Sequence, residues 1–279
     1  MEGSFIRKLN AGIVIFFITV VSMVVVYPLV YVVSAAFNPG NSVADLSVVP
    51  FGNGFTTAHF THLFTKTDYP KWFRNTLTIS ALTSLGTVIV ASLGAYTFSR
   101  FKFTFKKPMM LSLLILQIFP SFVGMIAIYV ILYRFGLLDK LWGLVLVYMA
   151  GNIPYNTWLV KSYLDTIPKS LDEAARIDGA GHLRIWATIV MPIAKPILIF
   201  LAITSFTGPW MDFIFPKMVL RSPENQTLAL GLFSFITDKN NAFTNFAAGS
   251  LIVAVPFVIF FVVTQKMLVT SLGGSAVKE

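Results

Sequence analysis

The sequence of 279 residues contains no cysteine and few charged side chains. The absence of cysteine excludes disulfide bonds, thiolate catalysis and thiolate metal sites. Only 12% of the residues are Asp, Glu, Lys or Arg, about half the share found in a soluble domain. Together with 56% hydrophobic residues and a mean hydropathy of +0.77, this scarcity of charge argues against a soluble globular protein.

Several patterns that mark enzymes and nucleotide-binding proteins are absent as well. No GxxxxGKS/T sequence occurs, so the chain is not expected to bind or hydrolyse ATP itself. The HExxH and GxSxG patterns of metalloproteases and esterases are also missing. His59 and His62 have no third ligand residue nearby, so no metal site and no cofactor is expected in this chain. The residues therefore offer no catalytic set.

Long apolar blocks are what the sequence does contain. A helix rises about 1.5 Å per residue, so roughly 20 apolar residues cross the hydrocarbon core of a bilayer. Six blocks are long enough, and they predict an all-α integral membrane fold, a bundle of six transmembrane helices. The predicted spans cover residues 11–37, 75–99, 108–133, 141–159, 189–215 and 246–267, within a single domain over residues 1–279.

The net charge of +9 is explained by membrane topology rather than by nucleic-acid binding, because the basic residues flank the apolar blocks. The short link between the second and third spans carries four of them, and the rule that cytoplasmic loops are basic is most reliable in short loops. Both termini are therefore predicted to be cytoplasmic. The predicted cytoplasmic side holds 13 of the 21 basic residues: Arg7, Lys8, Arg100, Lys102, Lys106, Lys107, Lys161, Lys169, Arg176, Arg184, Lys195, Lys266 and Lys278.

The cytoplasmic segment 161–188 has strong helix signals. Ser170 and Glu173 have the spacing of a capping box, in which each side chain bonds the backbone N–H of the other residue. Gly179 and Gly181 can end the helix, because glycine adopts the left-handed conformation that follows many helices. A second helix is expected from His182 to about Met191. On local chemistry alone this helix-turn-helix could be a projecting docking element or a plain link between spans.

The pattern Glu173-Ala174-Ala175, followed by Gly179 and later by Ile189, Met191 and Pro192, is similar to the EAA motif of ABC-importer permeases. It differs in having methionine where leucine is more common. The segments 152–159 and 95–100 resemble the carbohydrate-importer branch. The segment 206–216 is similar to the maltose and maltodextrin permeases of MalG type. The resemblance extends over nearly the whole chain from residue 75 onward.

This resemblance implies a set of partners and roles. The chain would be a sugar permease of the bacterial cytoplasmic (inner) membrane, paired with a second homologous permease subunit and an extracytoplasmic sugar-binding protein. A cytoplasmic ABC ATPase dimer would carry the ATP and Mg²⁺. The helix-turn-helix would be the coupling element seated on the ATPase, and the last residues would reach toward that dimer. The implied docking residues are Glu173, Ala174, Ala175, Asp178 and Gly179.

Two further groups of residues are candidates for contact with sugar or with the binding protein. The external segment 216–244 is too long for a simple turn, and long ordered loops are commonly functional. The resemblance implies that its residues Arg221, Asn225, Thr227 and Gly231 contact the binding protein. Polar residues at membrane depth are expensive to bury and often functional, although each can instead bond between helices. The polar candidates for a sugar path are Gln117, Asn152, Asn156, Thr204 and Ser205, and Trp210 is a candidate because its ring could offer a flat apolar face to a sugar.

Other functions stay open at this point. The same importer architecture could carry lactose, raffinose or glycerol phosphate instead of maltodextrins. A secondary transporter or channel is the alternative class, but such carriers place charged residues deep within their spans. Nearly all charges in this sequence lie near the ends of the predicted spans. An integral membrane enzyme would need a catalytic cluster that the sequence does not contain.

Overall fold

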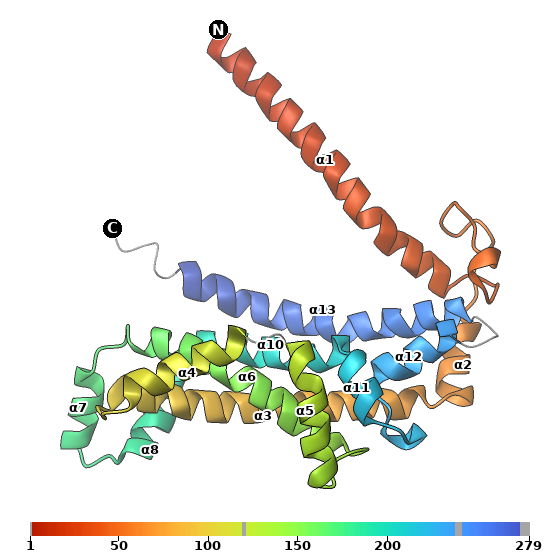
Figure 1. Cartoon of the computed structure of the whole chain (residues 1–279). Coiled ribbons are helices and arrows are strands. Elements are labelled where there is room, and N and C mark those ends of the chain that lie inside the picture. Colours follow the sequence, from red (N-terminus) through yellow and green to blue (C-terminus); the bar gives the residue numbers. More distant parts are fainter. Residues whose placement is uncertain (1, 119–120, 238–241, 274–279) are drawn as a thin grey trace. The chain divides into compact units, whose positions relative to one another are not determined.

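The computed structural model describes residues 2–118, 121–237 and 242–273, and the regular secondary structure of these residues is helical (Figure 1). The predicted all-α class is therefore confirmed. The longer helices are α1 (Glu2–Ala36), α2 (Ala58–Lys66), α3 (Tyr69–Arg100), α4 (Lys106–Ile118), α5 (Ser121–Arg134), α6 (Leu141–Leu164), α7 (Ser170–Ile177), α10 (Lys195–Met211), α12 (Leu228–Thr237) and α13 (Phe243–Gly273). The shorter ones are η1 (Val43–Asp45), α8 (His182–Ile185), η2 (Trp186–Val190), α9 (Met191–Ile193), α11 (Ile214–Val219) and η3 (Pro223–Asn225).

The chain forms two compact units. The first unit contains residues up to Tyr69 together with Leu232–Pro256. Its polar centre is the buried ring of His59, whose Nε2 lies 2.8 Å from the carbonyl oxygen of Asn38. The other ring nitrogen lies 3.0 Å from Oδ1 of Asn245, so both nitrogens have a hydrogen-bond partner within the protein. This histidine therefore stabilises the loop that follows α1.

The second unit comprises Pro70–Gly231 and the residues from Phe257 onward. Within it, α10 and α4 both pack on α6, and α11 packs on α5. Small residues on the buried face of α3 permit close contact with other helices, as is usual in membrane bundles. The hydroxyl of Ser84 on α3 donates to the carbonyl of Ala202 on α10 at 2.9 Å. The indole N–H of Trp158 on α6 donates to the carbonyl of Met110 on α4.

Two apolar cores lie along α3 in this unit. One surrounds Ile79 and includes Leu144 and Phe215 from α6 and α11. The other surrounds Ala91, Ala95 and Tyr96 and includes residues of α6, α7, α8 and α10. The second core therefore joins the short helices after α6 to the membrane helices.

Among the described residues, two helices are long and apolar enough to cross a bilayer as single segments: Asn10–Ala36 and Tyr69–Arg100. Two bent pairs raise the number to four if each pair forms one span. Lys106–Ile118 and Phe122–Arg134 are bent by 106° within the predicted span 108–133, and His182–Ile193 and Lys195–Met211 are bent by 85°. The six-span arrangement as a whole stays a prediction.

The second of these bends shifts a predicted boundary. The sequence places the end of the second cytoplasmic helix at Met191-Pro192 and the start of a span at residue 189. In the structure the helical path runs to Ile193, and α10 starts after Ala194. Pro196 lies in the first turn of α10 and has no N–H group to continue the preceding helix. Residues 189–193 therefore belong to the segment before the bend.

Candidate functional site

The helix-turn-helix at residues 170–185 forms as the sequence predicts, but its first turn differs. The predicted capping box between Ser170 and Glu173 is wrong: α7 begins at Ser170 itself, and Lys169 is the N-cap residue. Lys169 has helical backbone angles and makes no side-chain cap, while its carbonyl accepts the N–H of Glu173 at 3.1 Å. The helix starts one residue early because the turn after Pro168 already has helical geometry. The Glu173 carboxylate therefore has no capping role.

The predicted stop of α7 is confirmed at Gly179, whereas Gly181 has an extended backbone with φ −72° and is the N-cap of α8. Gly179 has φ +81°, a left-handed conformation that side chains other than glycine rarely adopt. Its N–H donates to the carbonyl of Arg176, and the N–H of Ala180 donates to that of Ala175. This pair of hydrogen bonds is a Schellman motif, which satisfies carbonyls that the helix end would leave free. Gly179 thus sets the angle between α7 and α8.

The docking residues implied by the resemblance are divided between two faces of α7. Glu173, Ala174 and Asp178 are exposed, whereas Ala175 is only 8% exposed and belongs to the core around Tyr96. Ala175 therefore fits α7 against its own chain and offers little surface to a partner. The sequence-based interpretation missed large apolar side chains that are exposed on α7 and α8, namely Leu171, Ile177 and Leu183.

A buried ion pair that the sequence did not reveal lies at the base of α7. Nε of Arg100, the last residue of α3, lies 2.8 Å from Oδ2 of Asp172, with side chains 4% and 3% exposed. Beside it, Lys161 and Ser99 donate to the carboxylate of Asp165. Partial burial raises the pKa of Asp165, but these hydrogen bonds and the lysine charge hold it below its ordinary value. The two pairs join α3, α6 and α7.

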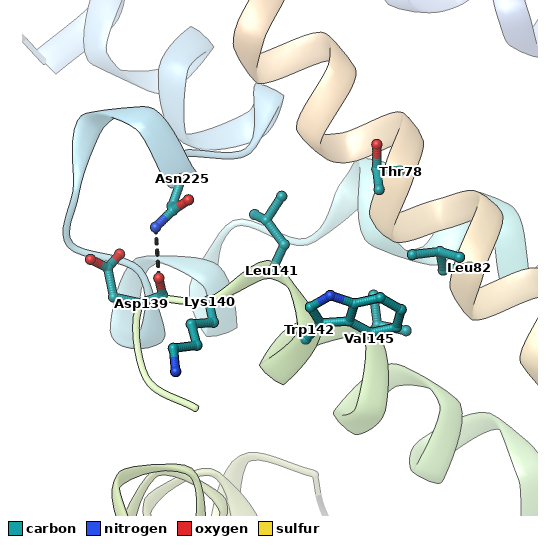
Figure 2. Close-up of a pocket in the computed structure, with 8 residues that line it drawn as sticks. All are labelled: Thr78, Leu82, Asp139, Lys140, Leu141, Trp142, Val145 and Asn225. Atoms are coloured by element: carbon teal, nitrogen blue, oxygen red, sulfur yellow. Dashed lines mark hydrogen bonds between the residues drawn. The ribbon is translucent and has the colours of Figure 1, made fainter. Parts of the chain in front are cut away.

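The segment from Arg221 to Asn225 is organised by Asp139, a residue that the sequence did not identify as part of a site. Its carboxylate accepts the N–H groups of Arg221 and Ser222 at 2.9 and 3.0 Å and the Ser222 hydroxyl. Its carbonyl accepts the side-chain amide of Asn225 (Figure 2). The guanidinium of Arg221 donates to the hydroxyl of Tyr129 at 2.7 Å. Two predicted contact residues are thus brought together through the α5–α6 turn.

A cavity of about 300 Å³ lies next to this turn (Figure 2). Its apolar wall includes Leu82 of α3 and Trp142 of α6, and its polar wall includes Asp139 and Asn225. Partial burial raises the pKa of Asp139, but the hydrogen bonds from Ser222, Arg221 and Asn225 outweigh it and lower the pKa to about 2. Because the carboxylate of Asp139 and the amide of Asn225 are engaged within the protein, we assign this cavity no ligand.

We expect Asp139→Asn to lower the stability of this turn by about 1 kcal/mol, since the carboxylate is partly solvated and its hydrogen bonds are screened. Asparagine tolerates the left-handed backbone at this position, where φ is +57°, so the substitution removes the charge and one of the two acceptor oxygens without straining the backbone. The folded-state pKa lies below the ordinary value of 3.8, so the stabilisation is present above pH 3.8 and is lost as the pH falls toward 2. Thermal unfolding of the detergent-solubilised protein measures this difference at each pH.

The matched control is Glu224→Gln, which removes a charge from an exposed residue of the same segment. It should leave the unfolding midpoint unchanged. An equal loss of stability for both variants, or a loss for Asp139→Asn that persists near pH 2, would contradict the role given to Asp139.

The other two residues predicted to contact a binding protein are buried. Thr227 directly precedes α12 and is 1% exposed, and its carbonyl accepts the N–H of Gly231 in the first turn of that helix. A Cβ atom on Gly231 would lie 2.1 Å from ring atoms of Trp72. The exposed part of this segment is therefore around Arg221 and Glu224, while Gly231 allows the close approach of α12 to the indole.

The sugar-path candidates do not converge on one open site. Gln117 is exposed on α4, and Thr204 is exposed on α10 with its hydroxyl donating to carbonyls of its own helix. Asn152 and Asn156 lie together on α6, where the buried amide of Asn156 donates to the carbonyl of Asn152. The hydroxyl of Thr204 and the side-chain N–H of Asn156 thus donate within their own helices.

The remaining two candidates are buried on α10. Ser205 is fully buried, and its hydroxyl has no hydrogen-bond partner among the described residues. The ring of Trp210 is 5% exposed and packs between Phe73, Phe206 and Phe257, with centroid distances of 5.3 to 5.9 Å. Aromatic neighbours surround this ring, so Trp210 does not offer an open surface in this conformation.

Comparisons with known proteins give consistent results. Residues 86–270 match the family described as binding-protein-dependent transport system inner membrane component. The chain is 41% identical over 279 residues to the maltodextrin transport system permease protein MdxG of Bacillus subtilis, with 100% of both chains covered. It is 38% identical to the galactooligosaccharides transport system permease protein GanQ of the same organism, covering 98% of this chain and 96% of that one.

A solved structure resembles the fold. A chain of a bacterial ABC transporter involved in the import of the acidic polysaccharide alginate superimposes with a TM-score of 0.80 and 21% identity. The match covers 93% of this chain and 96% of that chain. At this identity the likeness establishes the helical membrane fold.

Proposed function

The chain belongs to the family of binding-protein-dependent transport system inner membrane components, and from that premise we propose that it imports maltodextrins or related oligosaccharides. It is the permease subunit of an ABC importer, a non-catalytic, multi-pass component of the inner membrane. It works in a transporter complex with a binding protein. The observation that carries the substrate class is the 41% identity over the full length to a maltodextrin permease.

The helix-turn-helix is the docking site for the ATPase in this proposal. Its exposed surface combines the charged side chain of Glu173 with the small side chain of Ala174 and the apolar side chain of Ile177, which is 87% exposed. Together with the exposed Leu171 and Leu183, this side chain leaves apolar surface on α7 and α8 that a protein partner could cover. The ATPase would be a dimer that carries ATP and Mg²⁺, with a second homologous permease beside this chain.

The external contact with the binding protein centres on the segment held by Asp139. The exposed side chain of Arg221 and the η3 turn at Pro223–Asn225 can reach a partner, while Thr227 and Gly231 support this segment from inside. In this arrangement the docking helices lie on the cytoplasmic side together with both termini, and six spans connect the two surfaces. The resemblance implies that the last residues of the chain reach toward the ATPase, but the residues from 274 onward lie outside the described residues.

Transport by the complete complex tests this function. We expect proteoliposomes that contain this chain, the companion permease, the ATPase and the binding protein to take up labelled maltotriose only with ATP. Unlabelled maltotriose should compete, whereas lactose, raffinose and glycerol phosphate should not. Competition by galactooligosaccharides instead of maltotriose would move the substrate toward that of the GanQ relative. ATP-independent uptake by this chain alone would favour a secondary transporter.

A further inference from the structure

We infer that the ion pair between Arg100 and Asp172 is a positioning contact that fixes the docking helix α7 to the end of the membrane helix α3. The inference rests on the proposed function, because it concerns how a displacement of α7 by the ATPase reaches the spans. The two residues are 72 positions apart, and one lies at the end of a membrane helix while the other lies beside the proposed docking residue Glu173. Arg100 ends α3, and Asp172 immediately precedes the exposed Glu173.

The guanidinium of Arg100 contacts three segments at once. Its Nε donates to Oδ2 of Asp172 on α7 at 2.8 Å. One terminal nitrogen donates to the carbonyl of Leu164, the last residue of α6, at 3.1 Å. The other terminal nitrogen donates to the carbonyl of Ile167, in the link that leads to α7, at 3.2 Å. Three directed hydrogen bonds from one planar group hold the ends of α3 and α6 and the start of α7 in a fixed geometry.

The surroundings of this pair indicate that it fixes the orientation of α7 rather than adding to the stability of the fold. The pair is adjacent to the core formed by Tyr96, Ile167 and Ala175, where apolar side chains would pack well. Replacing a buried ion pair with apolar residues is often neutral or stabilising, because two charges must be desolvated to form the pair. Apolar packing would leave α7 free to slide or rotate against α3, whereas directed hydrogen bonds restrict both movements. Oδ1 of Asp172 has no partner in the described part of the chain, so Arg100 alone compensates this carboxylate there.

A nearby ion pair provides a comparison within the same region. Lys161 and Asp165 lie four residues apart at the end of α6, with side chains 19% and 42% exposed. Their contact stays within one helix end and does not involve α7. The pair of Arg100 and Asp172 thus contacts the docking helix, whereas the pair of Lys161 and Asp165 does not. Lys161→Gln, which breaks the second pair, is therefore the matched control for Asp172→Asn.

The experiment compares Arg100→Lys, Asp172→Asn, the double variant and Lys161→Gln in the assembled transporter. The primary readout is the ratio of ATP hydrolysed to sugar imported. We expect the ratio to rise at least about fivefold in Arg100→Lys and in Asp172→Asn, the low end of an ordinary coupling between sites. The double variant should not exceed the single ones, since they break the same contact. Lys161→Gln should keep the wild-type ratio.

A second readout reports position without transport. Because the chain has no cysteine, two can be introduced at exposed Thr97 on α3 and exposed Arg176 on α7 for spin labelling. The distance distribution between the labels should broaden in Arg100→Lys and Asp172→Asn and stay narrow in Lys161→Gln. Unchanged distances together with an unchanged ATP-to-sugar ratio in folded variants would overturn the inference.

An apolar double variant, Arg100→Met with Asp172→Leu, distinguishes a loss of coupling from a failure to fold. It should restore packing at this position without a directed contact. If it assembles and still shows a raised ratio and broadened distances, the inference is supported. If it couples like the wild type, or if it cannot assemble either, the pair is a folding element and the inference is wrong. A wild-type complex that hydrolyses ATP without importing sugar would contradict the proposed function instead, while the distance measurement would still test the contact.

Discussion

Replacing Glu173 with lysine is expected to abolish ATP-driven sugar uptake while leaving the permease folded. Glu173 is exposed on α7, and neither a capping bond nor an ion pair holds its carboxylate in the described structure. Its charge is therefore available for a basic residue of the ATPase. Juxtaposing two positive charges at an interface costs several kcal/mol, and each 1.4 kcal/mol is a tenfold change in affinity. We expect ATPase binding to weaken by about a hundredfold, measured by titration of the purified ATPase.

Two further variants separate the charge effect from other causes. Glu173→Gln removes the charge without reversing it and should give an intermediate affinity. Glu224→Lys makes the same change of charge at an exposed residue of the external segment and should leave ATPase binding intact. Monodisperse elution and an unchanged unfolding midpoint would establish that Glu173→Lys is folded. Normal uptake and normal ATPase binding by that variant would show that the docking role is wrong.

Substituting Gly231 with alanine is expected to destabilise the second unit strongly. A Cβ atom there would lie 2.1 Å from Cδ2 and Cε3 of the buried Trp72, well inside van der Waals contact. Neither α12 nor a large indole ring can move aside without opening its own packing, and such overpacking costs about 1–3 kcal/mol. The expected result is a lower unfolding midpoint and less folded protein, measured by fluorescence-detected chromatography after heating.

Gly208→Ala is the control for this substitution. Gly208 lies in α10, and apart from its chain neighbours and its own helix backbone no atom lies within 4 Å of the place that a Cβ would occupy, so alanine should be neutral or slightly stabilising. Trp72→Phe combined with Gly231→Ala should recover part of the lost stability, because the smaller ring makes room. If Gly231→Ala were as stable as the wild type but impaired only in stimulation by the binding protein, Gly231 would be a contact residue rather than a packing residue.

Much of the fold followed from local sequence signals. The length and apolarity of the blocks predicted membrane helices, and α1 and α3 have the length and composition to span a bilayer. The stop of α7 at Gly179 followed from the freedom of glycine to adopt positive φ. The start of α7 was misjudged, because the turn after Pro168 could not be inferred from the Ser170 and Glu173 spacing alone.

The arrangement of the candidate sites was harder to predict from the sequence than the helices were. The EAA pattern marked the helix that we propose docks on the ATPase, but the pattern cannot tell that Ala174 faces outward while Ala175 packs inward. The direction of each side chain depends on where α7 contacts the core around Tyr96. In the same way, Trp210 looked available to a sugar, although its aromatic neighbours come from helices that only folding brings together.

The sequence by itself determined the class of protein, its helical apolar blocks and the position of the helix-turn-helix at residues 170–185, because these depend on composition, hydrophobic length and helix-end chemistry within a few residues. Only the tertiary structure decided which polar groups act together. Arg100 meets Asp172 across 72 positions, and Asp139 meets Ser222 across 83. Buried charges and polar backbone groups must find partners, and in a helical bundle those partners come from whichever helix ends packing places beside them.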